Sequence, residues 1–270
     1  MTIRSNPIGV FDSGMGGLTC VRQLVKLLPT EDIVYLGDTA RVPYGNKSPN
    51  TIIKFSIQNS LYLLRFKIKL IVVACNTSSS FALDKLKTIF GIPIIGVIEP
   101  GVKRALELTK NKRIGIIGTN ATINSLAYQK KLIAAGSAVK VFAQSCPLFV
   151  PLAEEGWIRG RITEDIAKKY LAPLKNKNID TLVLGCTHYP LLKSAIAKVM
   201  GRSIRLVDSA EELALDVKAL MRSKGIASDR KIKGKIRFFL TDEPYKFKKT
   251  GERFLGRKLE SVYPVKENEF

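Results

Sequence analysis

Short apolar runs alternate with amphipathic segments of helical length along nearly the whole chain of 270 residues. The apolar runs are rich in β-branched residues, and most are followed by Gly, Asp, Asn or Ser, which predicts buried strands. These strands are predicted over 7–11, 33–36, 70–74, 93–98, 113–117, 139–143, 181–184 and 204–207. The intervening segments predict helices over 17–28, 50–66, 79–89, 100–110, 121–135, 162–173, 190–200 and 209–223. This alternation favours an α/β fold whose parallel sheets are covered on both faces.

A weak internal repeat relates the first part of the chain to the second. Residues 8–14 read IGVFDSG and residues 114–120 read IGIIGTN, while residues 71–77 read IVVACNT and residues 182–188 read LVLGCTH. A third pair of segments ends in VIE at residue 99 and in LVD at residue 208. Because the three matches occur in the same order, they predict two similar halves.

The repeat also predicts where the domains divide. The tail belongs to neither repeat, and its segments 234–240 and 260–264 resemble extra strands that return to the first half. We therefore expect two pseudo-symmetric parallel-sheet α/β domains with the active site between them. The first domain comprises residues 1–98 plus 211–270, and the second comprises residues 99–210.

Each half presents one cysteine at the carboxyl end of a predicted strand, Cys75 in the first and Cys186 in the second. Ligands of open α/β sheets bind at these strand ends, and the N-terminus of a following helix attracts anions and lowers the pKa of a thiol. Asn76-Thr77 and Thr187-His188 supply donors beside each sulfur. Two facing half-sites of this kind would hold a small anionic ligand between two thiols. The other cysteines, Cys20 and Cys146, are interpreted as core residues.

Three further groups of polar residues have two interpretations each. Asp12 and Ser13 precede the turn 14–17 (GMGG) and either contact a ligand or cap the helix that follows. His188, the single histidine, is an acid–base partner for Cys186 or a metal ligand, but no third and fourth ligands are evident, so no metal is expected. Glu154 and Glu155 either begin a solvated helix or act in catalysis.

The chain has a large excess of positive charge. It contains 44 Lys and Arg against 23 Asp and Glu, a net charge of +21. Such an excess is compatible with nucleic-acid binding, but no zinc-finger, zipper or RNA-binding signature accompanies it, so only incidental nucleic-acid contact is expected. No apolar run reaches the length of a membrane span, and no secretion signal is evident, so we expect a soluble, cytoplasmic protein without a membrane partner.

Several motifs together resemble those of the glutamate racemases, in the aspartate/glutamate racemase family. They are VFDSGMGGLT (10–19), YLGDTARVPYG (35–45), ACNTS (74–78), GVIEPG (96–101), CPLFVPL (146–152) and GCTHYPLL (185–192). The resemblance extends from residue 8 to about residue 220. It implies an isomerase that interconverts L- and D-glutamate without a cofactor and supplies D-glutamate for peptidoglycan synthesis. It also implies a homodimer, and in some relatives a cell-wall precursor activates the enzyme.

The resemblance further implies roles for individual residues. Cys75 and Cys186 would be the two catalytic bases, with Asp12, His188 and a glutamate, for which we favour Glu155 over Glu154, in catalytic roles. The residues at substrate-binding positions are Asp12, Ser13, Tyr44, Gly45, Asn76, Thr77, Thr187 and His188. Two bases agree with the chemistry, because racemisation removes a proton from one face of Cα and returns one to the other.

Three alternatives stay open on the sequence. Aspartate racemases share the two-cysteine architecture, but they typically have an acidic residue where this chain has His188. A thiol hydrolase built on Cys75 and His188 would leave Cys186 and the repeat unexplained. A nucleic-acid-binding protein on this fold would have salt-sensitive DNA affinity that survives loss of both cysteines.

Overall fold

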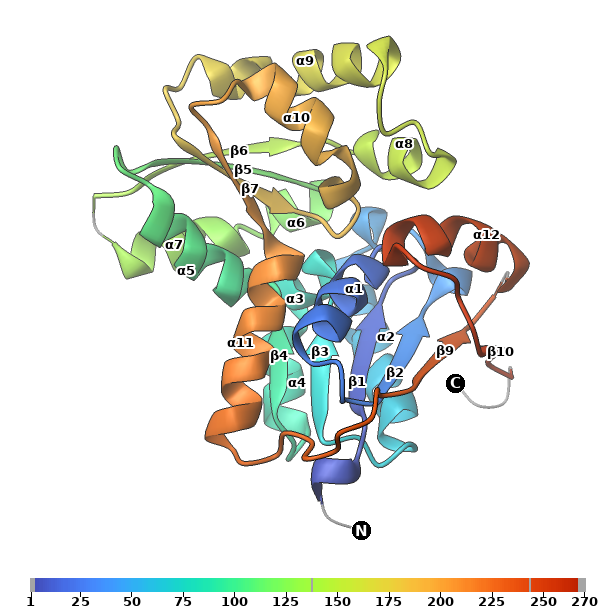
Figure 1. The fold of residues 1–270 in the computed structure, drawn as a ribbon. Helices are drawn as coiled ribbons and strands as arrows, with labels where there is room; N and C mark the ends of the chain where they lie inside the picture. The colour runs from blue at the N-terminus through green and yellow to red at the C-terminus, as the bar shows by residue number, and fades with distance from the viewer. Residues whose placement is uncertain (1–2, 137, 243, 267–270) are drawn as a thin grey trace.

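The computed structural model describes residues 3–136, 138–242 and 244–266, which form two parallel β-sheets flanked by helices (Figure 1). The strand order is β10-β9-β2-β1-β3-β4 in the first sheet and β6-β5-β7-β8 in the second. All strand pairs in these ranges are parallel. The predicted fold class, two parallel-sheet α/β units, is therefore confirmed.

The strands end close to where their apolar runs end. In the first sheet they are β1 (Ile8–Asp12), β2 (Ile33–Gly37), β3 (Leu70–Val73), β4 (Ile94–Gly96), β9 (Ile236–Leu240) and β10 (Val262–Pro264). In the second they are β5 (Arg113–Gly118), β6 (Lys140–Ser145), β7 (Thr181–Gly185) and β8 (Arg205–Asp208). Every residue of β1, β2, β3 and β7 is buried, which explains why these strands are apolar on both faces.

The helices depart from expectation in four places. They are α1 (Leu18–Leu27), α2 (Pro49–Leu64), α3 (Asn76–Phe81), α4 (Leu83–Ile89), α5 (Ile98–Leu108), α6 (Asn120–Asn124), α7 (Ala127–Ala135), α8 (Phe149–Glu155), α9 (Arg161–Lys175), α10 (Lys193–Met200), α11 (Ser209–Ser223) and α12 (Pro244–Leu255). The helix predicted over 79–89 starts three residues earlier and is divided into α3 and α4. The helix predicted over 121–135 is divided at Leu126, whose φ of 58° is left-handed. Helices α8 and α12 were not predicted.

The two sheets share one topology. The order β2-β1-β3-β4 in the first corresponds strand for strand to β6-β5-β7-β8 in the second. The registers correspond as well, since Ile8 of β1 pairs with Ile33 and Leu70 while Ile114 of β5 pairs with Val141 and Thr181. In both sheets the second strand in sequence lies on one side of the first strand, and the third lies on the other side. The gaps between β1 and β3 and between β5 and β7 are therefore topological switch points, where ligands of open α/β sheets bind.

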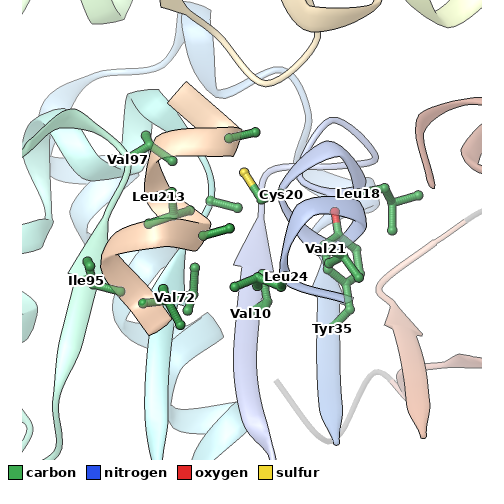
Figure 2. Close-up of a cluster of buried hydrophobic side chains, with 14 of the residues drawn as sticks. Val10, Leu18, Cys20, Val21, Leu24, Tyr35, Val72, Ile95, Val97 and Leu213 are labelled. Carbon is green, nitrogen blue, oxygen red and sulfur yellow. The ribbon is translucent and has the colours of Figure 1, made fainter. Parts of the chain in front are cut away.

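The tail of the chain joins the first sheet. Strand β9 pairs with β2, and β10 pairs with β9. Helix α11 connects the second sheet to this tail and packs against α1 and α5. Cys20 of α1 and Leu213 of α11 lie in the apolar core above Val10 and Val72 of the sheet, as Figure 2 shows. The domain boundaries given above stay a prediction.

No helix in the described ranges is both long and apolar enough to cross a membrane.

Candidate active site

A cavity of about 330 Å³ opens between the two sheets, at the carboxyl ends of their strands. Its walls come from the segments that follow β1, β2 and β3 of the first sheet and β5, β6 and β7 of the second. Both switch points therefore face the same space. Cys75 after β3 and Cys186 after β7 both line the cavity, so the sequence repeat places one thiol from each sheet at a single site.

Cys75 is the N-cap of α3, and its sulfur accepts a hydrogen bond from the backbone N–H of Ser78 at 3.4 Å. Its Sγ also lies 3.6 Å from the Oγ of Ser13. Burial, and after it the negative charge of Asp12, raises the pKa of the Cys75 thiol to about 11, although the hydrogen bonds with Ser78 and Ser13 oppose this. Cys75 is therefore a thiol at neutral pH.

Cys186 faces a histidine instead. The Nδ1 of His188 lies 3.8 Å from the Cys186 sulfur, and its Nε2 lies 2.9 Å from Oε1 of Glu154. Burial alone would lower the pKa of His188, but its hydrogen bonds with Cys186 and Glu154 outweigh burial and raise that pKa to about 10. The ring is therefore a cation at neutral pH, and it faces the Cys186 sulfur.

Asp12 lies behind the cavity wall. It is fully buried, its Oδ2 accepts the backbone N–H of Gly14 at 3.0 Å, and burial raises the pKa of its carboxyl. Its Oδ1 has no hydrogen-bond partner among the described residues. Asp12 thus closes the turn after β1 and places a carboxylate close enough to influence the Cys75 thiol. It does not cap α1, because the N-cap of that helix is Gly17, which has no side-chain cap hydrogen bond.

Gly16 lets the two half-sites approach each other. A Cβ at this position would lie 2.2 Å from Oγ1 of Thr187 and 2.5 Å from Nδ1 of His188. Thr19, the second residue of α1, donates a hydrogen bond to the backbone oxygen of Thr187 at 3.0 Å. The glycine turn 14–17 thus receives the side chains of Thr187 and His188 from the other half.

Tyr44 and Gly45 lie on the segment after β2 and line the cavity. The Tyr44 hydroxyl donates to the buried carboxylate of Asp38 and accepts from the Asn59 amide at 3.2 Å. Asp38 is held in turn by the guanidinium of Arg41, whose Nε lies 2.7 Å and 2.9 Å from its two oxygens. These contacts fix the cavity wall formed by the segment.

The structure gathers most of the predicted site residues. Those that line the cavity are Ser13, Tyr44, Gly45, Cys75, Asn76, Thr77, Cys186, Thr187 and His188. Glu155 is a correction: it is exposed and does not line the cavity, and its neighbour Glu154 contacts His188 instead. The roles of these residues in catalysis and binding stay a prediction.

Sequence reasoning missed Thr119, which lines the cavity after β5. Its Oγ1 lies 3.1 Å from Oγ1 of Thr77 and 3.0 Å from Oγ1 of Thr122, and Thr77 and Thr122 are also 3.1 Å apart. This hydroxyl cluster joins the two halves beside the cavity. The repeat contained the signal, because Thr119 stands in IGIIGTN at the position that Ser13 occupies in IGVFDSG. Among the described residues, no three His, Cys, Asp or Glu side chains lie close enough to hold a metal ion.

The chain has two parallel-sheet domains of equal topology, and one cysteine from each lines the same cavity. This arrangement is that of a two-domain α/β enzyme. The family model described as Asp/Glu/Hydantoin racemase matches residues 8–216. The chain accordingly belongs to this racemase family and is an isomerase.

Individual relatives and solved structures show which members of the family the chain is similar to. The chain is 48% identical to the glutamate racemase of Geobacter metallireducens over 258 residues, with 96% of each chain covered. It is similar to the crystal structure of Francisella tularensis glutamate racemase in complex with D-glutamate, with a TM-score of 0.92, 41% identity and coverage of 99% and 100%. It is also similar to Escherichia coli glutamate racemase in complex with L-glutamate and the activator UDP-MurNAc-ala, with a TM-score of 0.79, 27% identity and coverage of 96% and 98%.

Proposed function

We propose that this protein is a glutamate racemase that interconverts L- and D-glutamate by two-base proton transfer, without a cofactor. The single observation that carries the proposal is that Cys75 and Cys186 line one cavity from corresponding strand ends of two equivalent sheets. Stereochemical inversion at Cα needs a base and an acid on different faces of the carbon. Two half-sites of the same construction supply both without either group having to move across the substrate.

The proposed reaction begins with one thiolate and one thiol. In one direction the Cys186 thiolate takes the proton from Cα, and the electron pair of the C–H bond stays on the substrate as a carbanion. The Cys75 thiol then gives its proton to the other face of Cα and becomes a thiolate. The opposite enantiomer is converted by the reverse sequence, so protons and charge balance over each turnover.

The surroundings of the two sulfurs support this assignment of protonation states. The raised pKa of Cys75 keeps its proton in place, whereas the sulfur of Cys186 has the Nδ1 of His188 at 3.8 Å. Two identical groups whose environments differ in this way can serve as an acid and a base at one pH. We therefore propose that Cys75 is the acid and Cys186 the base in the resting enzyme, with Glu154 acting through His188.

The carbanion requires stabilisation by the protein. An α-proton is very weakly acidic, so fixed donors must hold the substrate carboxylate, where negative charge develops. Asn76, Thr77 and Thr187 line the cavity, are buried, and carry suitable donors. These side chains are almost entirely removed from bulk water, which strengthens their interactions with a bound carboxylate.

Glutamate is favoured over aspartate as the substrate. The curated relatives with 46–49% identity over at least 92% of this chain are glutamate racemases. His188 also stands where aspartate racemases typically have an acidic residue. We further propose that the D-glutamate supplies peptidoglycan synthesis in the cytoplasm, that the enzyme is a homodimer, and that a cell-wall precursor such as the activator seen with the Escherichia coli enzyme regulates it.

The proposal is tested with purified protein and no added cofactor in deuterated buffer, with L-glutamate and L-aspartate assayed side by side. We expect racemisation of glutamate with incorporation of deuterium at Cα. Cys75→Ala and Cys186→Ala should each lower the racemisation rate by about 10³-fold or more, as expected for loss of a catalytic acid or base. Each variant should still exchange the α-proton of one enantiomer, and the two variants should act on opposite enantiomers.

Cys20→Ala and Cys146→Ala are the matched controls, because both thiols are fully buried and neither lines the cavity. Both should retain turnover. Full racemisation by either cavity variant would contradict the two-base mechanism, and faster conversion of aspartate than of glutamate would contradict the proposed substrate.

A further inference from the structure

The oxygen and the nitrogen of the Asn76 carboxamide have different surroundings in this structure. Its Oδ1 accepts a hydrogen bond of 2.7 Å from the hydroxyl of Tyr128. Its Nδ2 is buried and has no hydrogen-bond partner among the described residues. Asn76 lines the cavity, whereas Tyr128 does not. A buried amide donor left unpaired beside a cavity costs free energy unless a ligand satisfies it.

Tyr128 connects both halves of the molecule. It is a fully buried residue of α7 in the second half, while Asn76 begins α3 in the first. Its hydroxyl also lies 3.2 Å from Oγ of Ser209 at the start of α11, and Ser209 donates to the backbone oxygen of Leu184 at 2.9 Å. Leu184 lies in β7, two residues before Cys186. One buried hydroxyl thus joins the segments that carry the two thiols.

Proton counting fixes the direction of the central hydrogen bond. A tyrosine hydroxyl has one proton, and a distance of 2.7 Å is normal for O–H···O but short for N–H···O. The Tyr128 proton is therefore used on Oδ1 of Asn76. Ser209 gives its own proton to the backbone oxygen of Leu184, and its Oγ lies 3.2 Å from the Tyr128 hydroxyl. The nitrogen of the Asn76 carboxamide is consequently the end that has no partner among the described residues.

We propose that Tyr128 is a positioning residue, whose hydroxyl holds the Asn76 carboxamide so that Nδ2 donates to a carboxylate of the substrate. The inference rests on the proposed function, because it assumes that an amino-acid carboxylate occupies the cavity. Without the hydroxyl, the amide rotates freely between its two orientations. One of them places an oxygen against the substrate carboxylate and repels it.

The test measures kcat and KM for L- and D-glutamate in Tyr128→Phe, which keeps the ring and removes the hydroxyl. We expect kcat/KM to fall by about tenfold for both enantiomers, the size of effect that loss of one buried hydrogen bond produces. In an Asn76→Ala background, where there is no amide to orient, the same substitution should change kcat/KM by less than about twofold. An equal fall in both backgrounds, or no fall in the native background, would overturn the inference.

Tyr189→Phe is the matched control. Its hydroxyl is also fully buried and donates to a backbone oxygen, that of Cys146, at 2.9 Å, but Tyr189 does not line the cavity. It should lower the melting temperature while leaving kcat/KM within about twofold of the native value.

Asn76→Asp gives a second measurement that leaves Tyr128 in place. The carboxylate still accepts the Tyr128 proton and turns an oxygen toward the cavity, so KM should rise more than in Asn76→Ala. A KM no higher than that of Asn76→Ala would show that the side chain at this position does not contact a substrate carboxylate, and would overturn the inference even if Tyr128→Phe did not fold. Native protein that does not racemise glutamate would overturn the proposed function, and the inference with it. An active native protein with unaffected variants would overturn the inference alone.

Discussion

At the scale of single residues, the two sulfurs have unlike neighbours. Cys75 has hydroxyl and backbone donors close by and the carboxylate of Asp12 behind it, whereas Cys186 has a cationic ring. The sequence repeat correctly indicates that the cysteines correspond, and it has His188 where the first half has Thr77, but it does not indicate that this ring is charged. The difference arises because His188 reaches Glu154, 34 positions away, and such a contact depends on tertiary packing.

The raised pKa of His188 predicts a pH-dependent stability. Its value of about 10 in the folded protein exceeds the ordinary value of about 6.5. A raised pKa stabilises the fold fully below the unfolded value, and this contribution is lost as pH rises toward the folded value. Urea unfolding of native protein and of His188→Asn should therefore differ most near about pH 6, and the difference should shrink toward about pH 10.

Glu154→Gln is the control for this measurement. It removes the carboxylate that helps to raise the His188 pKa, so the pH dependence of its unfolding free energy should be weaker than that of the native protein. A difference between native protein and His188→Asn that grows with pH would contradict the assignment.

Gly16 gives a second prediction at this scale. A methyl group there would collide with Thr187 and His188, so Gly16→Ala must push the second half-site away from the first. We expect kcat/KM to fall by about 10²-fold and stability to fall by about 1–3 kcal/mol, the usual cost of overpacking. Gly91→Ala is the matched control, because nothing lies within 4 Å of its added Cβ. Equal activity of the two variants would contradict a packing role for Gly16.

At the scale of elements, α8 explains why Glu154 and not Glu155 meets His188. The segment 149–155 ends in both glutamates side by side, and the motif alone does not show which one faces the cavity. As a helix, the segment places Glu154 three and four residues after Pro151 and Val150, which also line the cavity. Helical spacing puts these three on one face and turns Glu155 about 100° away from Glu154. Two prolines near the start of α8 concealed the helix from sequence reasoning.

Helix α12 is another element that the sequence did not predict, and it contacts the site. The ring of Phe254 meets the His188 ring edge to face at 5.2 Å, and Arg253 donates to the backbone oxygen of Glu154 at 3.2 Å. The helix was missed because it is strongly basic and lies in the tail, although Pro244 at its start and Gly256 just after its end are ordinary helix-boundary residues. The apolar residues of α12 pack against α1.

This contact predicts different effects for two phenylalanines of α12. Phe254 and Phe247 are both buried, but Phe247 packs on Tyr35, with ring centroids 6.1 Å apart, and not on His188. Phe254→Ala and Phe247→Ala should each cost about 3–5 kcal/mol of stability. Phe254→Ala alone should also lower kcat/KM, by about tenfold, because His188 loses the ring that holds it. Assays below both melting temperatures separate the two effects, and equal kcat/KM values would show that Phe254 acts only in packing.

At the scale of the whole molecule, the fold was easier to predict than the site. The alternation of apolar runs and the order of repeated motifs correctly predict two parallel sheets, because buried parallel strands appear in the sequence as short apolar runs separated by helical segments. The contacts between the two sheets produce no such pattern in the sequence. The hydroxyl cluster of Thr77, Thr119 and Thr122, for example, combines residues 42 and 45 positions apart.

The net charge of +21 is a property of the whole molecule and predicts how ionic strength affects the reaction. Glutamate is an anion, and a cationic protein attracts it at long range, but salt screens this attraction over about 10 Å at about 0.1 M. KM should therefore rise between about 0.01 M and about 0.3 M NaCl while kcat stays nearly constant. A KM independent of salt would show that the charge has no part in substrate capture. DNA binding measured in the same buffers tests the alternative use of this charge.

The unlike neighbours of the two thiols have a consequence for how the enzyme treats mirror images. L- and D-glutamate have equal free energies in water, so an equilibrium mixture contains equal amounts however the site is built. The unequal half-sites can nevertheless give each enantiomer its own saturated rate, balanced by its own affinity. After each turnover the proton has moved from one thiol to the other, and the enzyme must restore its starting state before it accepts the same enantiomer again. At high substrate concentration, that restoration can set the speed of the enzyme, and it would do so for one mirror image before the other.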